Sequence, residues 1–150
     1  MKKLIYILVL SLFVFNCSKD DDENTNTTFL EKYENTVWYS SENDAPSYIR
    51  FINNENNPLE YWIDLDDCYN YYLDTFYEGD TISKNSNDTL EFTYLESDGG
   101  VEYKDIITLT VSGNSIEVKF KYYENNELYE SGTQNFTKSS IDVDSFNLCD

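Results

Sequence analysis

The sequence predicts an all-β domain: a single antiparallel meander of about eight strands that closes into a barrel, preceded by one short helix. From residue 37 onward, apolar and polar residues alternate with a period of two. Tight turns rich in Asn, Asp and Gly separate the alternating segments. The chain also carries 14 Tyr, 9 Phe and 2 Trp, enough aromatic volume to build a core. A two-sheet β-sandwich also protects its sheet edges and is the alternative.

A short helix is expected to begin at a cap on Thr27 or Thr28 and to run through Asn35, and Thr28 and Glu31 have the spacing of a capping box. Four strands are expected to follow, over residues 37–41, 47–53, 59–65 and 68–76. The third alternates most regularly, with Tyr61 among its inward residues and Trp62 among its outward ones.

The second half of the chain is expected to form four more strands. Residues 77–88 are polar and are interpreted as a loop. The strands that follow are predicted at 89–95, 101–111, 116–123 and 127–138, and residues 139–150 form a tail. The turn sequences at 97–100, 113–114 and 125–126 predict that consecutive strands of this half are antiparallel.

Charge and composition exclude several classes of function. The chain has 29 Asp and Glu against 10 Lys and Arg, a formal charge of −19, so it lacks the basic clusters that nucleic-acid binding needs. It has no His, the commonest general base and transition-metal ligand. No nucleophile elbow, Gly-rich phosphate loop or zinc spacing is present. We therefore expect a monomeric, non-enzymatic domain without catalytic residues, metal or cofactor.

The first residues have the pattern of an export signal. Lys2 and Lys3 precede an apolar run at 4–15 that is too short to span a bilayer, and Cys17 follows after one further residue. This predicts a signal peptide over residues 1–16. An ordinary cleavage nearby, with Cys17 incidental, is the alternative.

The sequence around Cys17 resembles that of bacterial lipoproteins. Val14-Phe15-Asn16-Cys17 is similar to a lipobox, and the Lys and acidic run at 18–23 resembles the export signal of Bacteroidota surface lipoproteins. The resemblance implies that Cys17 is acylated, that residues 17–27 form a tether, and that the protein is anchored in the outer membrane and exposed at the cell surface. Two or more acyl chains would hold it stably.

With Cys17 assigned to the lipid, Cys68 and Cys149 remain. Two cysteines in an exported protein favour one disulfide, which would attach the tail to the middle of the fold. Two free thiols are the alternative.

The domain itself resembles the lipocalin-like small lipoproteins of Bacteroidota. The resemblance covers residues 29–138 and lies in a short helix leading to a first strand with a tryptophan, Phe29-Leu30-Glu31 followed by Thr36-Val37-Trp38, and then a meander. It implies that residues 28–150 form a lipocalin-like barrel.

Such a barrel either holds one small ligand or is filled by side chains. Eight aromatic residues are expected to face inward as pocket candidates: Trp38, Tyr61, Tyr71, Phe92, Tyr94, Tyr103, Phe120 and Tyr122. Asp105 falls on the same face, either as a site residue or at the rim. The first functional hypothesis is therefore a surface lipoprotein that binds a small apolar or amphipathic ligand.

The second hypothesis is an interaction protein with a filled core. Trp62 and Tyr72 are expected on outward faces of neighbouring strands, where they would dock a protein or glycan, unless the helix or the tail covers them. Thr81 and Thr89 each lie in an Asp-Thr-aliphatic sequence that resembles the O-glycosylation sites of exported Bacteroidota proteins.

Overall fold

The computed structural model describes residues 27–42 and 45–150. The predicted signal peptide 1–16, the predicted acylation site Cys17 and the tether as far as residue 26 lie outside the described residues. In the described part of the chain, no helix combines the length and the apolar character needed to cross a membrane.

The predicted helix is confirmed as α2, Phe29–Tyr33, and it begins with the predicted capping box. The Thr28 hydroxyl accepts a hydrogen bond from the Glu31 amide at 3.2 Å, and the Glu31 carboxylate accepts one from the Thr28 amide at 2.8 Å. The helix ends at Tyr33, earlier than predicted. Asn35, two residues further on, has a φ of 58°, in the left-handed region. Phe29 and Leu30 are fully buried, so this single turn is held mainly by packing.

In the described residues, nine strands form one antiparallel sheet, which confirms the all-β class. They are β1 Val37–Ser40, β2 Ser47–Phe51, β3 Leu59–Asp64, β4 Tyr69–Leu73, β5 Thr81–Ser86, β6 Thr89–Asp98, β7 Val101–Ser112, β8 Ser115–Glu124 and β9 Glu127–Ser139. Strand β5 lies where a loop was predicted. It is an edge strand whose only large apolar side chain, Ile82, packs against the core, so its sequence carries almost no alternation.

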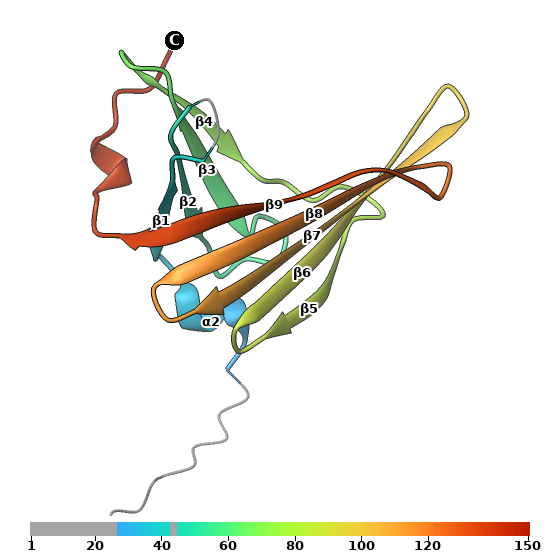
Figure 1. Cartoon of the computed structure of the whole chain (residues 1–150), viewed down its shortest axis with the longest axis horizontal. Coiled ribbons are helices and arrows are strands. Elements are labelled where there is room, and N and C mark those ends of the chain that lie inside the picture. The colour runs from blue at the N-terminus through green and yellow to red at the C-terminus, as the bar shows by residue number, and fades with distance from the viewer. Residues whose placement is uncertain (1–26, 43–44) are drawn as a thin grey trace, which may run out of the picture.

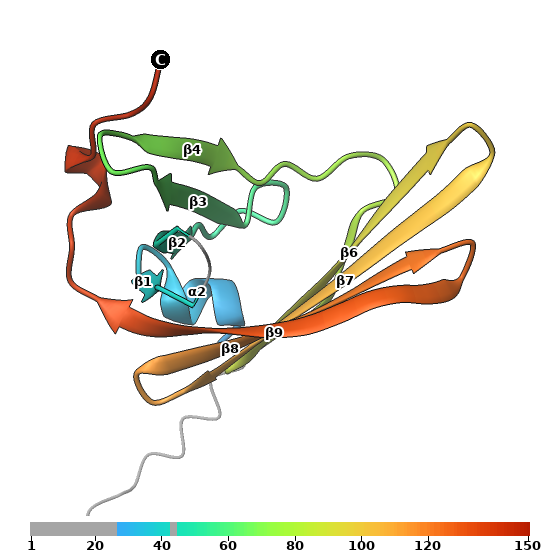
Figure 2. The ribbon, with the colours of Figure 1, turned by 45° about the horizontal axis from the view of Figure 1, so that its top comes forward.

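The strand order is β4-β3-β2-β1-β9-β8-β7-β6-β5, so every neighbour is consecutive in sequence except β1 and β9. Strands β4 and β5 end the sheet and do not pair with each other, so among the described residues the sheet is not closed into the expected barrel. The sheet curls instead: Figure 2 shows β3 and β4 facing the long strands β6–β9, with α2 between the two halves. Since there is one sheet, the two-sheet sandwich is not formed.

The connection at 74–80 passes between the two unpaired edges. Phe76 packs on Phe92 and Tyr94 of β6, with ring centroids 5.8 and 5.3 Å apart. Between β4 and β5 the contact is therefore aromatic packing of Phe76 on β6, and not the strand pairing that would close a barrel.

The main core lies where α2 meets the concave face of the sheet. Its largest fully buried side chains are Trp38, Phe29, Phe51 and Phe92. Trp38 Nε1 donates a hydrogen bond to the Thr36 hydroxyl at 2.9 Å, which satisfies the indole inside this core.

The C-terminal tail returns past β2–β4 (Figure 1), and its side chains pack on the outer face of these strands. The predicted disulfide between Cys68 and Cys149 is confirmed. The tail contains a short 3-10 helix, η1, Val143–Ser145. Beside the disulfide, Tyr69 exchanges main-chain hydrogen bonds with Asn147 and Cys149, so the tail also pairs with the first residue of edge strand β4. On the opposite side, the hairpins β6–β7 and β8–β9 project beyond the rest of the sheet.

Candidate ligand-binding site

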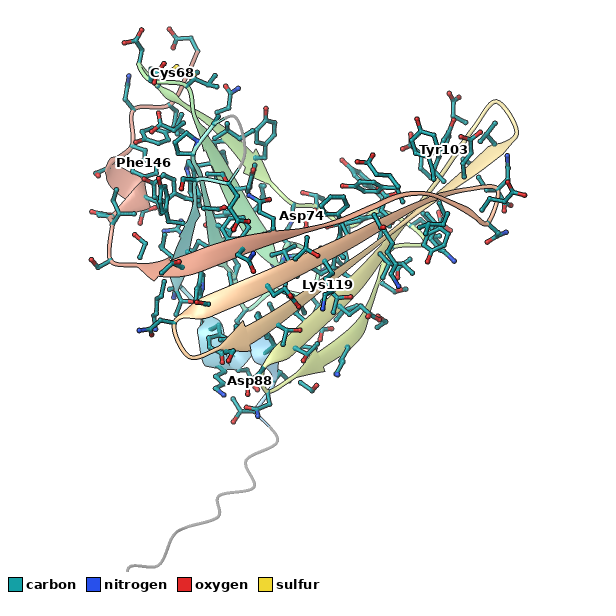
Figure 3. The ribbon with its side chains drawn as sticks, in the orientation of Figure 1. Cys68, Asp74, Asp88, Tyr103, Lys119 and Phe146 are labelled. Atoms are coloured by element: carbon teal, nitrogen blue, oxygen red, sulfur yellow. A yellow bond between two sulfur atoms is a disulfide. The ribbon has the colours of Figure 1, made fainter. Side chains whose placement is uncertain are left out.

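Two neighbouring cavities lie along the concave face of the sheet. The first, which we call the cup, has a volume of about 520 Å³ and is lined mainly by apolar side chains of β6–β9 with Ile49, Leu59 and Tyr61 from the other half. The second, the mouth, has about 610 Å³ and lies at the gap between β4 and β5. Figure 3 shows Asp74 at this gap and Tyr103 on the projecting hairpin, both far from Cys68 and Phe146.

The strand register arranges the concave side chains in rows that cross β6–β9. Residues that pair directly share a face, so the polarity of each row is fixed by the alternation in sequence. From the buried end outward, the rows are Leu90–Leu109–Val118–Gln134, then Phe92–Ile107–Phe120–Gly132, then Tyr94–Asp105–Tyr122–Glu130. The face therefore changes from apolar in the cup to acidic and tyrosine-rich at the mouth.

A glycine shapes the wall of the cup. A Cβ atom added to Gly132 would lie 2.2 Å from Cζ of Phe120, closer than atoms can approach. The tip of the Phe120 ring therefore occupies the space that a side chain at position 132 would need. Phe120 also packs on Tyr122, with ring centroids 5.2 Å apart.

One polar group in the cup has no partner. Nε2 of Gln134 is buried and makes no hydrogen bond with any of the residues that the structure describes. A buried amide N–H without an acceptor is costly, so this group is suited to an acceptor atom of a bound molecule.

Carboxylates dominate the mouth. Asp74, in the connection after β4, accepts a hydrogen bond from the Tyr94 hydroxyl across the gap. Burial raises the pKa of Asp74, Asp80 adds to the rise, and the bond from Tyr94 opposes it. Burial and the Asp74 carboxylate also raise the pKa of Tyr94. Asp80 accepts hydrogen bonds from the amides of Tyr77 and Leu95 at 2.8 and 2.9 Å.

Asp105 lies between Tyr94 and Tyr122 in the outermost of the three rows. Burial raises its pKa, and the nearby Glu96 raises it further. Burial and Asp105 in turn raise the pKa of Tyr122. Within the part of the chain that the structure describes, no Lys or Arg lines either the cup or the mouth, and no cation affects the pKa of Asp74 or Asp105.

The eight predicted pocket residues lie in four different places. Four line the cup and two line the mouth: Tyr61, Phe92, Phe120 and Tyr122, then Tyr94 and Tyr103. Trp38 faces inward but belongs to the solid core. Tyr71 lies on the opposite face of the sheet.

The predicted faces of Tyr71 and Tyr72 were wrong. Tyr72 pairs with Tyr61, and Tyr71 pairs with Trp62. The turn between β3 and β4 places Asp64 opposite Tyr69, so each odd-numbered residue of β3 shares a face with an even-numbered residue of β4. Tyr72 therefore lies on the concave side, and Tyr71 lies outside, where its hydroxyl donates a 2.8 Å hydrogen bond to Glu60.

The predicted outer patch is also corrected, because Trp62 is 3% exposed. The tail covers it with Val143 and Phe146, and the Arg50 guanidinium lies 5.3 Å from its ring centroid. Arg50 is held by Glu60 at 2.5 Å and by both oxygens of Asp144 at 2.9 and 3.0 Å. Covering by the tail was the stated alternative, and it is what occurs.

The predicted glycosylation sites differ in accessibility. Thr81 is exposed, but it begins β5 and does not lie in a loop. Thr89 is half-buried at the start of β6.

Sequence reasoning missed the role of Asp74 at the mouth, because its contact with Tyr94 joins parts of the chain that no local pattern links. Glu96 could have been found, since it continues the alternation of Phe92 and Tyr94. Within residues 27–42 and 45–150, no three His, Cys, Asp or Glu side chains are grouped so that they could hold a metal ion.

Comparisons with protein families, with curated proteins and with solved structures gave no match.

Proposed function

We propose that this protein is a non-enzymatic, lipid-anchored protein of the outer cell surface that binds a small amphipathic molecule in the cup of its lipocalin-like sheet. The observation that carries the proposal is the pair of adjoining cavities on the concave face, apolar in the cup and polar at the mouth. Both have the volume of small-molecule sites, and a mainly apolar wall with few polar groups is typical of them.

Two details support a bound molecule over a filled core. The Gly132 backbone lets the Phe120 ring lie against the wall of the cup. The unpaired Gln134 amide supplies a donor inside a space that is lined mainly by apolar side chains. Both details favour a bound molecule, because a densely packed core leaves few spaces of this size and few buried donors without a partner.

The test is native mass spectrometry of the full chain, purified from its own membrane in a non-ionic detergent. We expect a small molecule that is retained in the native spectrum and lost on denaturation. Ile107→Gln, which puts an amide into the cup, should abolish retention. Ile106→Gln is the matched control, because Ile106 is the adjacent residue on the convex face of β7 and is also half-buried. Wild-type protein that is bare from every preparation and binds no amphipathic probe would refute the proposal.

The anchor is tested separately. Growth with an alkyne-tagged fatty acid should label the wild-type protein and not Cys17→Ser, because Cys68 and Cys149 are joined in the disulfide. Protease added to intact cells should then degrade the domain if it faces outward. Labelling of Cys17→Ser at the wild-type level would contradict acylation at this position.

A second candidate function is docking of a protein or glycan, now at the projecting hairpins instead of around Trp62. Leu128 and Tyr129 are 56% and 77% exposed near the tip of the β8–β9 hairpin. A bare cup together with loss of cell-surface partner binding in Tyr129→Ser would favour this role.

A further inference from the structure

The geometry of the mouth points to a specific class of ligand: an amphipathic organic cation, with its apolar body in the cup and its ammonium group between Asp74, Asp105 and the tyrosines of the mouth. This inference rests on the proposed function and specifies its ligand.

The first argument is the segregation of charge between the two faces of the same strands. All lysines of β7 and β8 lie on the convex face: Lys104 pairs with Tyr123, and Ile106 and Thr108 pair with Lys121 and Lys119. Asp105 points the other way, into the mouth, together with Glu96 of β6, and Glu130 of β9 lines the cup on the same face of the sheet. The site thus attracts cations at short range, independently of the overall charge of −19.

The second argument is the enclosure of the carboxylates. Asp74 and Asp105 are partly buried, yet among residues 27–42 and 45–150 no Lys or Arg lines either cavity. A buried carboxylate normally has a cationic partner or hydrogen bonds that replace its hydration. Asp74 has the Tyr94 hydroxyl, and Asp105 has no hydrogen-bond donor among the described contacts. The raised pKa values of both groups have the same cause, negative charge that is desolvated without a counter-ion.

The third argument is the aromatic lining. Tyr77, Tyr94 and Tyr103 surround the acidic groups of the mouth. The faces of tyrosine rings attract organic ammonium groups, and the attraction is stronger where water is excluded. An anionic ligand such as a fatty acid would meet only carboxylates and ring faces here.

The spacing of the rows sets the length of the molecule. Ile107 in the cup and Asp105 at the mouth are two residues apart on β7, about 7 Å along the strand. A chain of about four methylenes therefore joins a ring seated beside Phe92 and Phe120 to an ammonium group beside Asp105.

The test compares three probes with the same apolar body: 4-phenylbutylamine, 4-phenylbutanol and 4-phenylbutyrate, which are cationic, neutral and anionic at pH 7. Each is titrated calorimetrically into the full chain in non-ionic detergent, against a blank of detergent alone. We expect one amine per chain, bound at least tenfold more tightly than the butyrate, with the alcohol in between.

Variants separate local charge from overall charge. Asp105→Asn and Asp74→Asn should each weaken amine binding about tenfold and leave alcohol binding within twofold of wild type. If either variant fails to fold, Glu96→Gln is used in its stead, because Glu96 lies at an exposed position of the mouth. Glu117→Gln removes one negative charge from the convex face and should change nothing.

Equal binding of all three probes, or tighter binding of the butyrate, would overturn the inference and leave the cup as a binding site. Weakening by Glu117→Gln equal to that by Asp105→Asn would also overturn it, since the effect would then be long-range. Absence of binding by all three probes would overturn both the inference and the proposed function. Loss of amine and alcohol binding in Ile107→Gln, but not in Ile106→Gln, would support the cup even if the charge preference failed.

Discussion

The ring of Phe146 stacks on the ring of Tyr69, with centroids 3.8 Å apart and planes 8° from parallel. Phe146 belongs to the tail and Tyr69 begins β4, so this contact joins the last residues of the chain to an edge strand. The same Phe146 ring lies edge-on to Trp62 at 6.4 Å. The tail is therefore the cover of the outer aromatic face, and it keeps Trp62 away from water.

Phe146→Ala should remove this cover. We expect the free energy of unfolding to fall by about 2 kcal/mol, less than for a fully buried Phe because Phe146 is half-buried. Tryptophan emission should move to longer wavelength as Trp62 meets water, while Trp38 stays in the core. Tyr129→Ala, at a 77% exposed position, is the control and should leave both readings unchanged. An unshifted emission in Phe146→Ala would show that the tail does not protect Trp62.

Removal of the disulfide should cost more than removal of this one ring. Cys68 and Cys149 are 81 residues apart in sequence, and releasing a loop of this size costs about 4–5 kcal/mol in the chain-entropy model. We expect Cys68→Ser/Cys149→Ser to unfold at much lower urea, and reductant to shift wild type to the same midpoint. A reductant-induced shift in the double variant would mean that reductant acts elsewhere.

The contact between Gly132 and Phe120 predicts a specific coupling. Gly132→Ala places a methyl group where the Phe120 ring now lies, so the ring must move into the cup. We expect a loss of about 1–3 kcal/mol of stability from this overpacking, together with weaker binding of any molecule in the cup.

A double-mutant cycle tests the cause. In a Phe120→Leu background the smaller side chain should accommodate the new methyl group, and Gly132→Ala should then cost at least about 1 kcal/mol less. Equal costs in the two backgrounds would contradict the contact.

Local patterns predicted most of the fold, because alternation and turn residues act within hairpins. The capping box at Thr28, eight of the nine strands and the pairing of Cys68 with Cys149 are confirmed. Strand β5 was missed because an edge strand does not need an apolar face. The sequence predicted a closed barrel and did not reveal that β4 and β5 stay unpaired. The segment that joins these two strands packs through Phe76 on Phe92 of β6, and no periodicity encodes such a contact.

The candidate site was predicted only in part, for a related reason. Tyr94 and Phe92 follow from alternation along one strand, but the face of Tyr72 depends on the register between two strands. A change of one residue in the pairing register moves every side chain of the strand to the other face of the sheet. The position of Asp74 beside Tyr94 depends on how a connecting segment crosses the gap, which only the assembled fold determines.

The last prediction concerns the pH dependence of stability through Asp74. Its pKa is raised in the folded protein, so the folded state binds this proton more tightly than the unfolded state does. Stability from this group must therefore increase as the pH falls from neutral toward the ordinary value of 3.8. In Asp74→Asn the group no longer titrates, so its stability relative to wild type should be highest at neutral pH and should decline toward pH 4.

Asp88→Asn is the control with the opposite sign. Asp88 accepts hydrogen bonds from Lys32 at 2.7 Å and Tyr33 at 2.5 Å, and these bonds lower its pKa. Its contribution is present above 3.8 and is lost as the pH falls through the lowered pKa. Asp88→Asn should therefore be less stable than wild type by a constant amount from pH 7 to 4, with the two converging only below that range. Urea unfolding of the three proteins between pH 7 and pH 3 measures both differences. A stability difference for Asp74→Asn that stays constant from pH 7 to 4 would show that its carboxylate is not desolvated at the mouth.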